Sequence, residues 1–119
     1  MLYLSQLLGR PIYDARNEKI ASINDILVEY GSEEYPPVIG VIARFQRRNF
    51  FIPGRNIAKL GLTGATMSSP RLDLTPFERR DGEVLLGKDV LDNQLIDVDG
   101  KRVVRVNDVQ LIEAGDIWR

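Results

Sequence analysis

The residues of this sequence that could do chemistry are its carboxylates, lysines, arginines and tyrosines, because the chain contains no Cys and no His. The absence of Cys excludes thiol chemistry, disulfides and cysteine metal sites. The absence of His removes the commonest metal ligand and the side chain best suited to proton transfer near neutral pH. No motif selects a pair of carboxylates, and no glycine loop is built to cradle phosphate. We therefore predict no catalytic residue, no cofactor and no enzymatic activity.

Carboxylates are concentrated toward the C-terminal end of the sequence. The members are Asp89, Asp92, Asp97, Asp99 and Asp108. Carboxylate oxygens are the ligands that Mg²⁺ prefers, so a metal site is one interpretation. The spacing gives it no support. Asp97 and Asp99 stand in a turn sequence that favours Asp, and Asp89 and Asp92 suit a helix end. We predict no metal site.

Arginine and phenylalanine residues alternate in one stretch near the middle of the chain. The members are Arg44, Phe45, Arg47, Arg48, Phe50 and Phe51. Cations beside rings can bind and stack on single-stranded nucleic acid. However, sixteen basic residues against seventeen acidic ones give a net charge of −1, whereas nucleic-acid-binding domains usually show a basic excess. We expect the rings to turn into a core and Arg47 and Arg48 to coat a hairpin tip as candidate interaction residues.

The most informative feature is an internal repeat. Residues 23–26 read INDI, and residues 106–109, at an offset of 83, read VNDV. The alignment extends in both directions at this offset without a gap, apolar positions stay apolar, and turn positions keep turn residues. A match of this extent indicates one supersecondary unit used twice.

Each repeat is predicted to be a β-hairpin. Residues 14–17 and 97–100 both open with Asp, and they close with Asn17 and Gly100. This pattern is typical of a type I turn followed by a residue with positive φ. The opening residues Asp14 and Asp97 can accept hydrogen bonds from the backbone of their own turn. A β-branched run follows each turn.

The run after the first turn does not alternate strictly. Ile20, Ile23 and Ile26 are spaced by three, where a flat strand needs two or four. A helix would accept this spacing, but the preceding turn and the β-branched content favour a strand with a bulge at Asn24-Asp25. We assign Asn24, Asp25 and their counterparts Asn107 and Asp108 to backbone hydrogen bonding at bulges rather than to ligand binding.

Two further strands are expected between the repeats. The apolar run at residues 38–45 predicts the first of them, and residues 49–53 predict a shorter strand that ends at a proline. Arg47-Arg48 marks the turn between the two. Residues 56–60 are compatible with a brief turn or a strand.

The other segments are expected to be connections or short helices. Residues 61–69, rich in Gly, Thr and Ser, predict a flexible connection. Short helices are expected at residues 4–8, with Ser5 as the N-cap, and within residues 84–92.

The two repeats continue differently. The first bulged strand is followed by a loop and then by residues 38–45, whereas residues 113–116 read as a loop that is followed only by Ile117-Trp118-Arg119. We therefore expect a fragment of a longer protein, with a barrel strand truncated at Trp118. An unpaired edge there would tend to pair with another chain.

Several of these segments together resemble the PRC-barrel family. The resemblance is carried by LGRPIYD at residues 8–14, KIASINDI at residues 19–26 and FFIP at residues 50–53, and it covers about residues 4–60. Asn17 and Ser22 stand where the family often has Gly. The family includes the cytoplasmic domain of the photosynthetic reaction-centre H subunit and the C-terminal domain of the ribosome maturation factor. It also includes domains that precede the intracellular and CBS regions of MgtE-type magnesium-transporter homologues, which the second repeat resembles most.

The resemblance implies an all-β fold, a small PRC-like barrel with a repeated bulged hairpin and at most short helical turns. We expect a first PRC-barrel unit at residues 1–62, a linker at residues 63–83, and a second, incomplete unit at residues 84–119 that packs on the first or swaps with it. The resemblance to the PRC-barrel family further implies a non-enzymatic docking or regulatory module that is part of a longer magnesium-transporter-like protein. The alternative is an RNA- or ribosome-associated assembly module like the barrel of the ribosome maturation factor.

The remaining expectations concern location and partners. The longest apolar run is too short to span a bilayer and the N-terminus lacks a signal-peptide layout. We expect a cytoplasmic protein, located at the membrane face through its full-length chain. The expected partner is another protein or the rest of its own chain, together with a homodimer that uses the edge at Trp118; nucleic acid is not expected.

Overall fold

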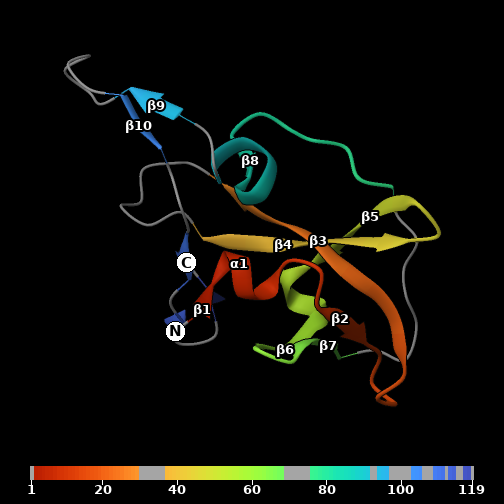
Figure 1. Ribbon diagram of the computed structural model, residues 1–119. Coiled ribbons are helices and arrows are strands. Elements are labelled where there is room, and N and C mark those ends of the chain that lie inside the picture. The colour runs from red at the N-terminus through yellow and green to blue at the C-terminus, as the bar shows by residue number, and fades with distance from the viewer. Residues whose placement is uncertain are drawn as a thin grey trace.

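The computed structural model describes residues 2–29, 37–68, 76–91 and 109–111, and the backbone of four further strands at 94–96, 103–105, 113–114 and 117–118. Within these residues the chain forms strands joined by short turns (Figure 1). The predicted all-β class with short helical turns is confirmed. None of the helices in the described part of the chain is long and apolar enough to cross a membrane.

One seven-stranded sheet holds most of the fold together. Its strands are β2 (Pro11–Tyr13), β3 (Lys19–Glu29), β4 (Val38–Phe45), β5 (Arg48–Pro53), β6 (Ile57–Gly61), β7 (Gly64–Met67) and β8 (Glu83–Leu85). The order is β5-β4-β3-β2-β7-β6, with β8 paired to the C-terminal half of β3. The outermost strands β5 and β6 are joined through the single 3₁₀ turn η1 (Gly54–Asn56) and are not paired with each other. The sheet is therefore not closed by hydrogen bonds in the described part of the chain.

Three short strand pairs and two one-turn helices complete the described structure. They are β1 (Leu2–Tyr3), α1 (Leu4–Leu7), η2 (Leu86–Val90), β9 (Gln94–Ile96), β10 (Val103–Arg105), β11 (Gln110–Leu111), β12 (Glu113–Ala114) and β13 (Ile117–Trp118). β1 pairs with β11, β9 with β10 and β12 with β13. The β9–β10 hairpin projects away from the main sheet in Figure 1.

The bulge in β3 explains how apolar residues spaced by three reach the same core. The register with β4 shifts between Ile23 and Asp25, which inserts Asn24 as an extra residue. Because a one-residue insertion reverses the alternation of side chains, Ile23 and Ile26 both point inward, with exposures of 1% and 0%. The main core also contains residues of α1, β2, β4, β5, β7, η2 and β11: Leu4, Leu7, Ile12, Val41, Ala43, Ile52, Ala65, Met67, Leu86 and Leu111.

The repeat is visible in the backbone as well as in the sequence. Leu95 pairs with Val104 and Gln94 with Arg105, the counterparts at an offset of 83 of the pairs Ile12–Ala21 and Pro11–Ser22. The one-turn helices α1 and η2 likewise stand at matching places. Each is followed by an extended residue, Leu8 and Leu91, whose N–H donates back to the first residue of the helix. The strand pairing is thus the same in both repeats, whereas the helical turn is one residue wider in the second, because Leu8 donates to the residue four positions back and Leu91 to the residue five positions back.

Some local predictions were wrong. Strand β7 stands where we expected a flexible connection and pairs with β6, so that residues 64–67 of the expected linker belong to the sheet. Helix α1 has Tyr3 rather than Ser5 as its N-cap, because the Gln6 side chain accepts the Tyr3 N–H at 3.0 Å.

Two turns also differ from the prediction. The β4–β5 turn is made by Gln46 and Arg47, whose φ angles of 50° and 65° leave Arg48 as the first residue of β5. Part of the predicted loop at residues 113–116 is the strand β12, which pairs with β13.

Candidate functional site

The first predicted turn is organised around a buried carboxylate. Asp14 is 5% exposed, and its Oδ1 accepts the backbone N–H groups of Arg16 at 2.9 Å and Glu18 at 3.0 Å. The N–H of Asn17 donates to the Asp14 carbonyl, and Asn17 has a φ of 65°. Asp14 and Asn17 therefore shape the β2–β3 turn.

Asp25 has more distant partners than the sequence suggested. Its side chain, 4% exposed, lies beside the bulge and accepts the Ile26 N–H at 2.7 Å. It also accepts two N–H groups from the start of η2, Gly87 at 2.6 Å and Lys88 at 2.9 Å. A Cβ on Gly87 would lie 2.9 Å from the Asp25 Oδ1, so glycine allows this close approach. Asp25 thus joins the first repeat to the second.

Several predicted residues of the second repeat lie outside the described residues. They are the turn and bulge residues Asp97, Gly100, Asn107 and Asp108, together with the acidic residues Asp92 and Asp99. The backbone of Trp118 lies in β13, but its side chain is also outside the described part. The described residues contain no group of three or more side chains that could hold a metal ion.

Asp89 is bound within the chain. Its Oδ2 accepts the Leu85 N–H at 2.9 Å and lies 3.0 Å from the Arg79 guanidinium. Arg79 also donates to the Asp89 Oδ1 at 3.3 Å. The carboxylate thus holds the turn between β8 and η2, a role consistent with its expected place beside a short helix.

The arginine stretch lies at the β4–β5 hairpin. Arg44, Arg47 and Arg48 are exposed, whereas Phe50 is buried and Phe45 is half-buried against the main core. Phe51 packs on the opposite face of the sheet. The rings therefore pack within the fold, while the guanidinium groups face solvent.

A second apolar cluster lies on the outer face of the sheet. Leu27, Ile42 and Leu85 are its buried members, and Ile39, Phe51 and Phe77 pack against them half-buried. This face exists because Leu27 points away from the main core while its neighbours Ile26 and Val28 point into it. Residues 76–80 cross the face, held by a bridge between Phe50 and Pro76 and by a hydrogen bond from the Phe77 N–H to the Asn49 carbonyl.

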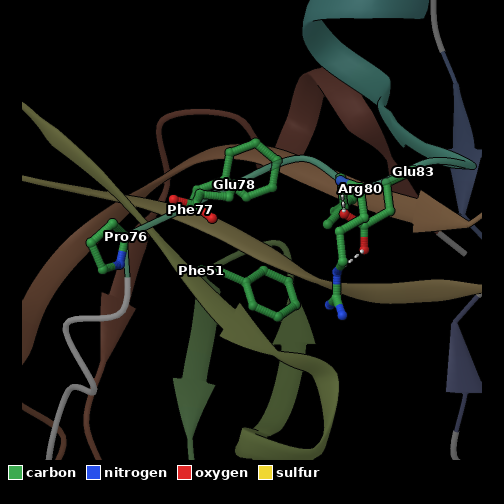
Figure 2. A pocket seen from close by; sticks show the side chains of 7 residues that line it. Phe51, Pro76, Phe77, Glu78, Arg80 and Glu83 are labelled. Atoms are coloured by element: carbon green, nitrogen blue, oxygen red, sulfur yellow. Dashed lines mark hydrogen bonds and ion pairs between the residues drawn. The ribbon is translucent and has the colours of Figure 1, made fainter.

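The crossing segment leaves the apolar face partly open. A hollow of about 290 Å³ is lined by Phe51 and Phe77. Figure 2 shows their two rings with Pro76 at one end and Arg80 and Glu83 at the other. A second hollow of about 340 Å³ shares Phe51, Arg80 and Glu83 and extends to Glu29, Ile39, Pro53, Arg55 and Asp81. We call the two hollows together the outer groove.

Charged groups surround the outer groove. Glu83 is 7% exposed; its Oε1 accepts the Arg80 N–H at 2.8 Å, and its Oε2 lies 3.6 Å from the Arg80 Nε. Four carboxylates and two guanidinium groups line the two hollows, which gives a formal net charge of −2; they are Glu29, Glu78, Asp81, Glu83, Arg55 and Arg80. An apolar floor with an acidic rim suits the binding of an apolar side chain that has cationic neighbours.

Sequence reasoning missed the outer groove. Phe77 is the one clue in the local pattern, because it is a large ring inside the otherwise charged stretch at residues 76–82. Apart from the residues of the segment around Phe77 itself, the lining comes from distant positions on β3, β4, β5, η1 and β8. Their meeting depends on the pairing of β8 with β3, which no local pattern specifies.

Comparison with known proteins gives one result. The family model for the PRC-barrel domain matches residues 1–71. No curated protein and no solved structure matches the chain significantly. The matched range contains β1 to β7 and therefore includes the hairpin and bulge of the first repeat.

Proposed function

The chain belongs to the PRC-barrel domain family, and from this premise we propose that it is a non-enzymatic docking module that binds a protein segment in its outer groove. The observation that supports this proposal most directly is the second apolar cluster. Its members Ile39, Phe51 and Phe77 are only half-buried, and a partly open apolar surface bordered by polar groups is typical of an interaction site.

The acidic rim indicates the chemistry of the segment that would bind. With a formal net charge of −2 around the two hollows, a segment with Lys or Arg beside a Leu, Ile or Phe is favoured over an acidic one. The rings of Phe51 and Phe77 would contact the apolar side chain. The carboxylates of Glu29, Glu78 and Asp81 would attract its cations, since Glu83 already pairs with Arg80.

The proposal extends to the setting of the module. We propose that it belongs to a longer magnesium-transporter-like protein at the cytoplasmic face of a membrane, and that its docking partner lies in that protein or in one associated with it. An RNA-binding role has less support, because Phe50 is buried and the ring of Phe45 packs against the main core. Packed rings are not available to stack on bases.

The docking proposal predicts which peptides the purified chain will select from a phage-displayed library of random linear peptides. Enriched peptides are expected to combine an apolar residue with Lys or Arg. Their affinity should fall as salt screens the rim and should fall about tenfold or more in the variant Phe51→Ala.

The matched control is Phe45→Ala, since Phe45 is also a half-buried ring of the same sheet but does not line the outer groove. This variant is expected to bind the enriched peptides as the unmodified chain does. Enrichment of acidic peptides, or an equal loss of affinity in both variants, would contradict the proposal.

The transporter setting predicts the size and location of the protein in its native cells. An antibody against residues 1–119 should detect a band far above the 13.5 kDa of this chain, in the membrane fraction. A band at 13.5 kDa in the soluble fraction would contradict this setting while leaving the docking proposal intact. A salt-dependent gel shift with RNA at micromolar protein concentration would instead favour the nucleic-acid alternative.

A further inference from the structure

The first segment of each repeat pairs with the other repeat. We call residues 2–7 and residues 83–90 the entry segments of the first and second repeats. Strand β1, in the first entry segment, pairs antiparallel with β11 of the second repeat. Strand β8, in the second entry segment, pairs antiparallel with β3 of the first repeat. The exchange is therefore reciprocal.

The helical turn that follows each entry strand is also held by the opposite repeat. The Leu4 N–H donates to the Val109 carbonyl at 2.7 Å. At the matching place in η2, the N–H of Gly87 donates to Asp25. Gly87 stands 83 residues after Leu4, and Val109 stands 83 residues after Ile26, the neighbour of Asp25. The two donors are thus equivalent under the repeat, whereas the acceptors differ: a backbone carbonyl at Val109 and the side chain of Asp25, one position before the counterpart of Val109.

The exchanged segments carry large apolar side chains into the core. Leu4 and Leu7 of the first entry segment are 0% exposed, and Leu85 and Leu86 of the second are 7% and 6% exposed. Leu111, which receives β1, is 1% exposed. Burial of large apolar side chains is a main stabilising term in folding, so the exchange is a large part of what joins the two repeats.

A reciprocal contact of this kind has the symmetry of a two-fold dimer interface, in which each partner offers the same surface to the other. The backbone N–H and C=O groups of β3 and β11 can pair equally well with an entry segment of the same chain or of another copy. We propose that a second copy of this chain makes the same exchange, so that the protein forms a dimer in which the entry segments of two copies are swapped. This inference does not depend on the outer groove.

Concentration decides which form is populated. A tethered segment competes at an effective concentration on the order of millimolar, depending on the linker. The exchange within one chain therefore dominates in dilute solution, and the exchange between copies becomes populated when the protein is unfolded and refolded near millimolar concentration. Domain swapping has a low free-energy cost because it replaces contacts with identical ones.

The absence of native Cys allows a direct test by disulfide formation. Tyr3 and Gln110 are both exposed and lie opposite each other in the β1–β11 pair. Directly paired residues of antiparallel strands are within the range that a disulfide spans. The chain with both substitutions, Tyr3→Cys and Gln110→Cys, should form an internal disulfide when it is refolded and oxidised at micromolar concentration.

Exchange between copies is tested with a mixture of the two single variants, one of which carries an affinity tag. After joint refolding near millimolar concentration, the mixture should give a disulfide-linked dimer of one tagged and one untagged chain. The control mixture contains Tyr3→Cys and Lys59→Cys, because Lys59 is exposed on β6 and does not pair with β1. A mixed dimer no more abundant than in this control would overturn the proposal.

A second measurement uses the unmodified chain. Light scattering after refolding near millimolar concentration should detect a dimer fraction that is lost after unfolding and refolding at micromolar concentration. A sample that contains only monomer after both treatments would overturn the proposal even if the variants fail to fold.

Discussion

Replacement of Asp25 by alanine is expected to lower the free energy of unfolding by about 3 kcal/mol, because it leaves several backbone N–H groups without an acceptor. The carboxylate accepts the N–H groups of Ile26, Gly87 and Lys88, and the side chain is only 4% exposed. An unsatisfied buried donor costs about 1–3 kcal/mol, and the two donors in η2 are partly buried. Urea unfolding followed by circular dichroism measures the change.

The variant Asp25→Asn distinguishes the effect of losing the carboxylate from the effect of losing side-chain volume. An amide keeps one oxygen acceptor but places an NH₂ group where the second oxygen accepted the Lys88 N–H. We expect it to be destabilised, though less than Asp25→Ala. The control Asp81→Ala removes an exposed carboxylate and should change stability by no more than about 0.5 kcal/mol.

Hydrogen exchange should locate the effect of Asp25→Ala at the junction of the two repeats. Amide exchange is expected to accelerate first in β8 and η2, because Asp25 holds the start of η2, while β4 and β5 stay protected by their own pairing. Equal stability of Asp25→Ala and Asp81→Ala, or unchanged exchange in residues 83–90, would show that Asp25 does not join the repeats.

Replacement of Gly64 by alanine is expected to destabilise the protein by about 3 kcal/mol or more. Gly64 begins β7 with a φ of +120°, a conformation that L-residues rarely adopt and that costs on the order of 1–3 kcal/mol. A Cβ there would also overlap the carbonyl oxygen of Pro11 on the neighbouring strand β2. Because both obstacles belong to the backbone, no side-chain rotation relieves them.

The matched control for Gly64→Ala is Gly61→Ala, which lies on the opposite side of the same β6–β7 turn and pairs with Gly64. A Cβ on Gly61 would meet no atom within 4 Å, and Gly61 does not have a positive φ. Thermal unfolding should show a large decrease in Tm for Gly64→Ala and little change for Gly61→Ala. Similar effects of both substitutions would contradict the parallel pairing of β7 with β2 that brings Gly64 against Pro11.

Local patterns predicted the strands with the strongest signals. The expected strand at residues 38–45 coincides with β4, and the three-residue spacing of Ile20, Ile23 and Ile26 led to a bulged strand, as β3 is. Strand β7 was missed because its residues, Gly-Ala-Thr-Met, have little β-propensity. It forms because β2 and β6 offer it backbone partners on both sides.

The same holds for the buried carboxylates: hydrogen bonds to residues near in sequence could be predicted, and hydrogen bonds to distant residues could not. Asp14 could be assigned to its turn from the sequence, because its hydrogen-bond partners lie within four residues. Asp25 was placed at a bulge, but its partners Gly87 and Lys88 are 62 and 63 residues away. The outer groove was not foreseen at all, since its lining comes from β3, β4, β5, η1, β8 and the segment between β7 and β8.

The sequence by itself determined the all-β class, the repeated hairpin and the resemblance to the PRC-barrel family, because periodicity, turn residues and repeat spacing act over short stretches of chain. Only the tertiary structure decided that β8 pairs with β3 and β1 with β11. These pairings use backbone groups that every residue carries, so side-chain patterns do not specify the partner. They also decide which N–H groups Asp25 accepts and where the outer face stays open. For that reason, docking in the outer groove and the exchange of entry segments between copies both follow from the fold.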